Sequence, residues 1–231
     1  MTVLEALGIT TERIKAWVEE QFAEQLADVQ YQEFKINSIG NKIDDVGGSF
    51  IQTRYVEIGT TVNTVTIEWS LNKAPASQTL NGTAIDANDR RATIPFDDGL
   101  TSTRSFSLTA VDGRGNSKSG STSVNFVNGI YYGVLEHGCT IDRPTILALN
   151  KKLQRDGDKS LDFNVTPSAS EHIVYALPHR YGTPVFSVGG WVGGFYLHDT
   201  FMLENGSEYS ELYDIWLSDE VDLGYTSVNV K

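Results

Sequence analysis

The residues of this 231-residue chain that could carry chemistry are four histidines, one cysteine and several adjacent acids. The histidines are His137, His172, His179 and His198, and none has the spacing of a metal site such as HxH or HExxH. Cys139 lies two residues from His137, but a catalytic thiol needs a positioned base, which a sequence neighbour rarely supplies. The sequence therefore predicts structural or surface histidines, a buried or incidental thiol and no metal site built from histidine or cysteine, and it leaves a lone surface calcium open.

Paired carboxylates could hydrolyse a glycosidic bond. Adjacent acids occur at Asp44-Asp45, Asp97-Asp98 and Asp219-Glu220, each in turn-like sequence that is typical of a solvated surface. The glycine-rich segment 189–194 lies between predicted strands and opens no helix, so it lacks the helix N-terminus that holds a phosphate. We expect no catalytic residues, no cofactor and no enzyme activity. The alternative of an enzyme, a small glycan hydrolase, depends on these acids alone.

The composition narrows the classes of partner. A net charge of −12 argues against nucleic acid, because phosphate binding needs clustered Lys and Arg. No apolar run approaches the ~18 residues of a membrane span, and the first residues lack the basic and apolar regions of a signal peptide. With one cysteine no intrachain disulfide can form, so we expect folding in a reducing cytoplasm.

The elements that must position any site begin with a predicted helix over residues 10–29. Its apolar side chains recur at three- and four-residue spacing, and the acids lie largely off that stripe. The stripe either packs on its own domain or docks against other subunits, and the sequence leaves both open. The candidate assembly interface is Ile14, Trp17, Val18, Phe22 and Leu26. Residues 30–49 have little periodicity and are predicted to be a connector.

From residue 50 the period changes from 3.6 to 2. Val65, Ile67 and Trp69 alternate with polar residues, as in a half-buried strand with Trp69 in the core. Asn81-Gly82 between apolar residues is a strong hairpin signal. About six or seven short strands with regular turn signals predict an immunoglobulin-like β-sandwich over residues 50–134, here without the usual disulfide.

Residues 135–231 are predicted to form a second β domain. A short helix of about three turns begins near Asp142-Arg143-Pro144, because proline is favoured in a first turn. The strands that follow are rich in aromatic residues, which either fill a sandwich core or stack on sugar rings. The candidate ligand contacts are Tyr181, Trp191 and Tyr196.

The segment from Val65 to Val134 carries a set of motifs that resembles a known module. They are Trp69-Ser70-Leu71-Asn72-Lys73-Ala74-Pro75, then Leu80-Asn81-Gly82, Phe106-Ser107-Leu108-Thr109-Ala110-Val111-Asp112-Gly113, and the stretch Val124 to Val134. Together they resemble an Ig-like module that recurs in virion structural proteins of tailed bacteriophages. Residues 173–195 and 223–230 are similar to the domain that often follows it.

The resemblance covers residues 62–231 and implies a virion component of tail, baseplate, neck or head-fibre type. It implies no catalytic residues and leaves the N-terminal 60 residues unassigned. We therefore expect a mainly β protein with an N-terminal amphipathic helix and connector (1–49), an Ig-like β-sandwich (50–134), and a second β-sandwich-like C-terminal domain preceded by a short helix (135–231).

Two functions follow as expectations. The first is a non-enzymatic structural component of a phage virion, a homo-oligomer made in the host cytoplasm that assembles with other virion proteins through its N-terminal region. The second is a module that binds a carbohydrate or host receptor through its C-terminal aromatic residues. A location in the virion fits both.

Overall fold

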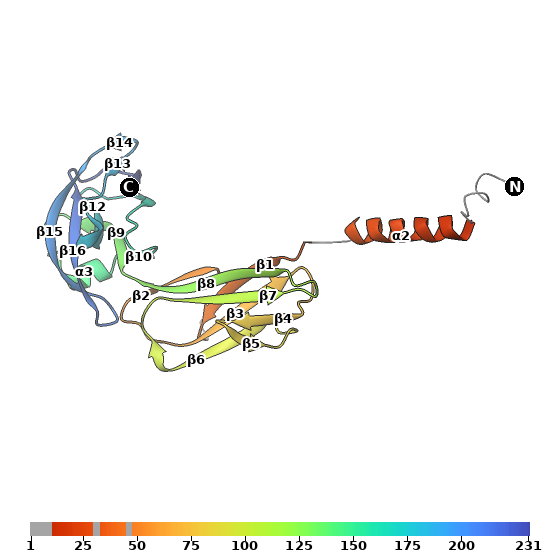
Figure 1. The fold of residues 1–231 in the computed structure, drawn as a ribbon. Helices are drawn as coiled ribbons and strands as arrows, with labels where there is room; N and C mark the ends of the chain where they lie inside the picture. Colours follow the sequence, from red (N-terminus) through yellow and green to blue (C-terminus); the bar gives the residue numbers. More distant parts are fainter. Residues whose placement is uncertain (1–10, 30–32, 45–47) are drawn as a thin grey trace.

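The computed structural model describes residues 11–29, 33–44 and 48–231, without the side chains of residues 11 and 24–29. Helix α2 (Thr11–Val29) precedes two β domains, which follow one another along the chain (Figure 1). The fold is mainly β and sandwich-like, as the alternating patterns predicted.

Two sheets form the Ig-like sandwich. One has the order β1 (Ile36–Ile43), β3 (Val62–Leu71), β6 (Arg91–Leu100). The other has the order β2 (Thr53–Glu57), β8 (Ser117–Val127), β7 (Arg104–Val111), β4 (Ser77–Leu80), β5 (Thr83–Ile85). Strand β2 pairs in parallel with β8, and every other pairing in the two sheets is antiparallel.

The apolar face of β3 fills the centre of this sandwich. Val65, Ile67 and Trp69 are almost wholly buried, which confirms the predicted alternation and the role of Trp69 as the core aromatic. The indole Nε1 donates a 3.1 Å hydrogen bond to Oε1 of the buried Gln78. The polar atom of this large core residue is therefore satisfied inside the sandwich.

The hairpin between β4 and β5 confirms the Asn-Gly signal. Leu80 pairs with Thr83 across the turn, and Asn81 and Gly82 have φ angles of 51° and 80°. Both central positions of a type I′ turn need positive φ, which asparagine and glycine tolerate best. The sequence thus specifies the register of this hairpin locally.

Strand β1 corrects the prediction that residues 30–49 form a connector. Residues 36–43 pair with β3, and Asn41 is fully buried between the two sheets. The Asn41 amide donates to Thr122 Oγ1 at 2.6 Å and to the Ser123 carbonyl at 2.9 Å. These hydrogen bonds hold β1 against β8. Because they depend on polar side chains, the sequence of β1 lacks the alternating apolar pattern by which a strand is predicted.

The C-terminal domain contains two further sheets. The five-stranded sheet has the order β10 (Asn150–Leu153), β9 (Gly129–Glu136), β12 (Glu171–Pro178), β16 (Ser210–Ser218), β15 (Phe195–Glu204). The four-stranded sheet has the order β11 (Leu161–Val165), β17 (Thr226–Val230), β13 (Phe186–Val188), β14 (Trp191–Val192). A single 3₁₀ turn, η1 (His179–Tyr181), follows β12.

Strand β12 is buried along almost its whole length because each face of its sheet contacts a separate apolar cluster. Ile173 and Tyr175 belong to the cluster shared with the four-stranded sheet, and Val174 and Ala176 belong to the cluster that includes Ile146 of α3 (Arg143–Leu147). Asp142 caps α3 by accepting from the Thr145 amide. The predicted helix start is therefore confirmed, but the helix has five residues rather than three turns, because residues 150–153 pair with β9.

The boundary between the β domains lies at Asn128, not at residue 134. Strand β8 ends at Val127 and β9 begins at Gly129 in a different sheet, so residues 129–134 belong to the C-terminal domain. The buried Glu57 accepts from the Tyr131 hydroxyl at 3.2 Å and pairs with Lys151 Nζ at 2.8 Å. Burial, assisted by Glu57, raises the pKa of the Tyr131 phenol. These bonds join the two domains directly.

Gly59 lies at the same joint and provides a test of how closely the domains pack. Its φ is +94°, and an added Cβ would lie 2.5 Å from the Ser207 carbonyl oxygen of the other domain. Gly59→Ala should lower the free energy of unfolding by about 2 kcal/mol or more, whereas Gly82→Ala, with φ +80° but open space, should cost about 1 kcal/mol. Urea denaturation measures both, and equal losses would contradict the close joint.

Candidate functional site

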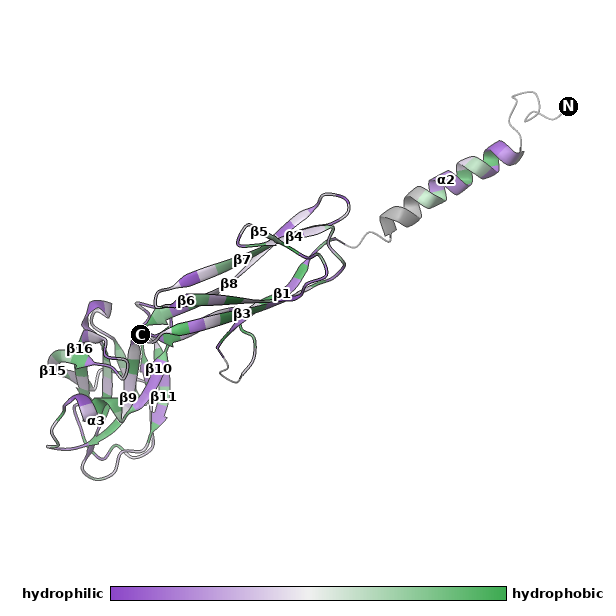
Figure 2. Cartoon of the chain, turned by 90° about the horizontal axis from the view of Figure 1, so that it is seen from below, coloured by the Kyte–Doolittle hydropathy of each residue, from purple (hydrophilic) through white to green (hydrophobic). Residues whose placement is uncertain are grey.

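The predicted assembly stripe of α2 is exposed to solvent. Trp17 and Phe22 are 61% and 60% exposed, Ile14 is exposed and Val18 is partly buried. The side chain of Leu26, the fifth predicted residue, lies outside the described residues. In Figures 1 and 2 the helix lies apart from both β domains, and green apolar positions are visible along it. The described side chains of the stripe therefore do not pack on the chain's own domains, which was one of the two alternatives.

The charges of α2 restrict what could cover this stripe. Its sequence contains Glu12, Glu19, Glu20, Glu24 and Asp28 against only Arg13 and Lys15. Two such helices side by side would place like charges near one another, which is unfavourable. An apolar groove with basic side chains at its rim complements the helix better than a second copy does.

The three predicted ligand contacts of the C-terminal domain have different surroundings. Trp191 is 83% exposed and Tyr196 is 40% exposed, so both rings are accessible. Tyr181 is buried, which corrects its assignment to an accessible surface, and its hydroxyl donates to Asp156 at 2.8 Å. Burial, assisted by that hydrogen bond, raises the pKa of Tyr181 to about 12. Tyr181 is therefore a core residue of the domain.

Trp191 projects from a hairpin whose shape depends on glycine. Gly189, Gly190, Gly193 and Gly194 all have positive φ, between 57° and 111°. Other residues rarely adopt this conformation, so the four glycines allow the tight turns on either side of β14. The neighbouring Val192 is exposed too. An exposed Trp-Val pair at the edge of a sheet is suited to binding rather than to core packing.

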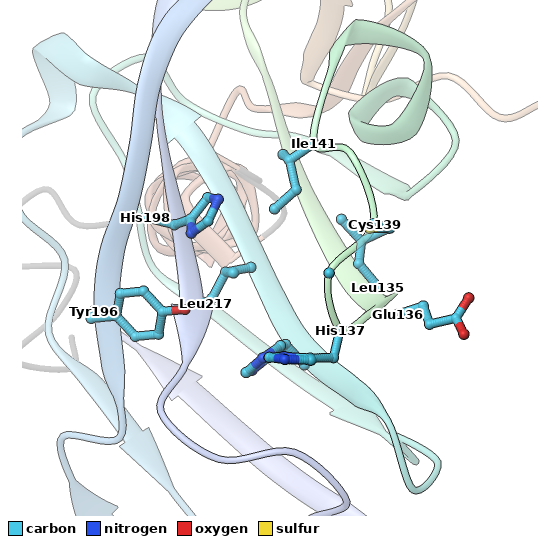
Figure 3. A pocket seen from close by; sticks show the side chains of 10 residues that line it. Leu135, Glu136, His137, Cys139, Ile141, Tyr196, His198 and Leu217 are labelled. Carbon is cyan, nitrogen blue, oxygen red and sulfur yellow. The ribbon is translucent and has the colours of Figure 1, made fainter.

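A pocket of about 170 Å³ brings together three of the four histidines, which the sequence did not predict. Figure 3 shows His198 and Tyr196 of β15 on one side, and His137, Cys139 and Ile141 of the β9–α3 segment on the other. The third histidine, His172, comes from β12. The signal was absent from the sequence because these residues are separated by tens of positions and only sheet pairing unites them.

Two histidines of this pocket, His137 and His172, are hydrogen-bonded within the fold. His172 Nδ1 lies 2.8 Å from the Ser218 carbonyl oxygen, so that nitrogen donates. In the neutral form of the ring its Nε2 then accepts from His137 Nδ1, which lies 2.9 Å away. His137 is thus directed to His172, and no hydrogen bond links it to Cys139 among the described residues. The arrangement therefore lacks the nucleophile-base contact that a thiol enzyme uses.

A second polar cluster, which the sequence analysis also missed, surrounds Asp214. His179 Nδ1 and Thr200 Oγ1 lie 2.8 Å and 2.7 Å from Oδ1 of this buried carboxylate. The hydroxyl of Thr200 contacts the carboxylate itself, so it does not form the nucleophile-histidine pair of a hydrolytic triad. These hydrogen bonds connect η1 and β15 to β16.

The ionisable side chains that the structure describes form no metal centre. Within residues 11–29, 33–44 and 48–231, no group of three or more His, Cys, Asp or Glu side chains is arranged to hold a metal ion. Neither α2 nor α3 combines the length and the apolar composition of a membrane span. Comparison with known proteins finds no matching family, no matching curated protein and no matching solved structure.

Proposed function

We propose that this chain is a non-enzymatic structural component of a tailed-phage virion that attaches through α2 and displays its β domains. The observation that carries the proposal is the exposed apolar stripe of α2. Trp and Phe side chains are large, and soluble proteins seldom expose a contiguous apolar stripe unless it marks an interaction site. The stripe and the acids of the helix fit an apolar groove with a basic rim on another virion protein.

The stripe also restricts the geometry of docking. Ile14, Val18 and Phe22 lie four residues apart and form one ridge along the helix. Such a ridge packs into a groove at a crossing angle of about −50°, whereas a coiled coil needs a sustained seven-residue repeat. The partner surface is therefore a crossed groove rather than a long parallel helix.

Density-gradient fractionation of phage particles tests the proposal. The chain should sediment with intact particles at a constant ratio to the major capsid protein and should stay with them through a second gradient. Recovery only in the soluble fraction would overturn the proposal. A salt wash before the second gradient separates a chain held by its apolar stripe from one that is only adsorbed by charge.

A second candidate function is binding of a host-surface glycan or receptor, and the exposure of Trp191 favours it. Aromatic rings that project from a rigid scaffold present a flat apolar face to a ligand, which a sugar ring can stack against. On this hypothesis the glycine hairpin holds the indole ring outward, free of other packing.

Trp191→Ala should then reduce host-cell binding at least tenfold without changing the melting temperature, because the ring contributes little to the core. Tyr225→Ala is the matched control, since it also removes an exposed aromatic ring, from another loop. Cell pull-down with a labelled chain measures both. Equal binding by the wild type and the Trp191 variant would exclude this function for the hairpin.

A further inference from the structure

Strand β15 is an open edge of the C-terminal domain. It has ten residues, ends the five-stranded sheet and contains no proline, lysine or arginine. Leu197 is exposed and Met202 is 59% exposed. An exposed edge of this length is a template for pairing with another strand. Figure 1 shows β15 on the side of the domain that faces away from the Ig-like sandwich, so that domain does not cover it.

The other edges are short or carry features that discourage such pairing. Pro95 interrupts β6, and Lys151 and Lys152 lie on β10. Ile51 bridges to Asn41 along β1, and Arg54 donates to the Asn41 carbonyl there. The remaining edge strands are short, with five residues in β2 and β11, three in β5 and two in β14. The contrast makes β15 the least protected edge among the described strands.

Two hydrogen bonds show which residues of β15 face the open edge. The Thr200 amide donates to Oδ1 of Asp199, the preceding residue, at 2.7 Å, and the Glu204 carbonyl accepts from Arg143 Nε at 2.7 Å. Both groups are therefore turned away from β16. Because the direction alternates along a strand, the amide and carbonyl of Met202 also face outward. Arg143 covers the end of the edge at Glu204, and Asp199 occupies the Thr200 amide. The outward amide and carbonyl of Met202 and the carbonyl of Thr200 are left for pairing, and the Thr200 amide joins the ladder once it exchanges its contact with Asp199 for one with the second strand.

We propose that β15 pairs antiparallel with β15 of a second copy of this chain, with the two-fold axis at Thr200. This register places Thr200 opposite Thr200 and Asp199 opposite Phe201 of the second copy, so no like charges face one another. Glu204 keeps its ion pair with Arg143 at the end of the ladder. The Met202 amide donates to the segment around His198 of the second copy, where β15 has a bulge.

The choice of a second copy follows from this self-complementarity. A two-fold pairing uses the same edge on both copies and consumes it, so assembly stops at a dimer rather than growing into a fibre. The inference goes beyond the proposed function, because strand pairing between copies does not depend on α2 or on a particle. Pairing of β15 gives a homo-oligomer, whereas association of α2 with a second α2 is disfavoured by its excess of acidic residues.

Sedimentation and light scattering of the full chain over a range of concentrations test the pairing. All measurements use the variant with Trp17→Glu and Phe22→Glu, which removes any association through α2. The expected species is a dimer of 25.5 kDa chains that dissociates on dilution. Met202→Pro should weaken it at least about tenfold, because each copy loses an outward amide donor. Met202→Ala, the matched control, keeps the amide and should stay within about threefold of the parent.

A measurement without substitutions at the edge keeps the test independent of folding defects. Hydrogen exchange of the Met202 amide should be slowed at high concentration relative to low concentration, while exchange in β3 should not change. A parent chain that is monomeric at all concentrations would overturn the pairing. So would equal dimer affinity of the proline and alanine variants, or a Met202 amide that exchanges equally fast at both concentrations.

Discussion

A chain with both Trp17→Glu and Phe22→Glu is expected to be lost from purified virions, with incorporation reduced about 100-fold or more. Burial of each aromatic ring contributes about 1.5–3 kcal/mol, and a carboxylate in the same groove adds a desolvation cost. The two losses together correspond to at least two orders of magnitude in affinity. Both side chains are exposed, so the melting temperature of the free chain should not change. Immunoblotting of particles assembled with each variant measures the effect.

The matched control places the same two charges on the opposite face of the helix. Ala16 and Ala23 are exposed and lie seven residues apart, on the side away from Trp17 and Phe22. A chain with Ala16→Glu and Ala23→Glu should be incorporated at close to the wild-type level. Equal loss in both variants would mean that charge alone prevents assembly, and retention of the stripe variant would contradict docking through α2.

Trp69→Ala is expected to lower the free energy of unfolding by about 3–5 kcal/mol, the usual range for removing a large aromatic residue from a core. Trp69 is 2% exposed and packs between both sheets of the Ig-like sandwich. The substitution also leaves Oε1 of buried Gln78 without the indole donor, which adds to the cost. Urea denaturation followed by circular dichroism measures the change.

Trp191→Ala serves as the reference for the same substitution at an exposed site and should change stability by no more than about 0.5 kcal/mol. A loss below about 1 kcal/mol for Trp69→Ala would contradict its place at the centre of the sandwich. A loss of about 3–5 kcal/mol in both variants would show that substitution of tryptophan, not its burial, determines the effect.

Elements of the fold that depend on local pattern could be predicted from the sequence. The alternation of Val65, Ile67 and Trp69 predicts the buried face of β3. The pair Asn81-Gly82 predicts the turn of the hairpin between β4 and β5. In both cases the residues that determine the structure are neighbours in the sequence. The start of α3 belongs to the same class, because the Asp142 cap acts within one turn.

Features that depend on distant partners could not be predicted in this way. Strand β1 is held by Asn41, which bonds residues that lie 81 and 82 positions away. The change of sheet at Asn128 has no signature either, since the strand pattern continues from β8 into β9 with one residue between them. Periodicity reports which face of a strand is buried but not which sheet receives it.

The candidate sites show the same division. The spacing of the apolar residues predicts a stripe on α2. It does not predict that the stripe is exposed, because the pattern of a helix does not show which surface covers it. Tyr181 and Trp191 each have a glycine next to them in the chain, yet Tyr181 is buried with its hydroxyl on Asp156, and Trp191 projects into solvent. The pocket of His137, His172 and His198 exists only through the pairing of distant strands.

The copy number of the chain per particle tests the proposed structural role in a virion. Quantitative mass spectrometry of twice-banded particles, with labelled peptides from the Ig-like sandwich as standards, gives that number. A structural component should be present in a fixed number of copies that is the same in independent preparations. A trace amount that varies between preparations, or no signal at all, would contradict it.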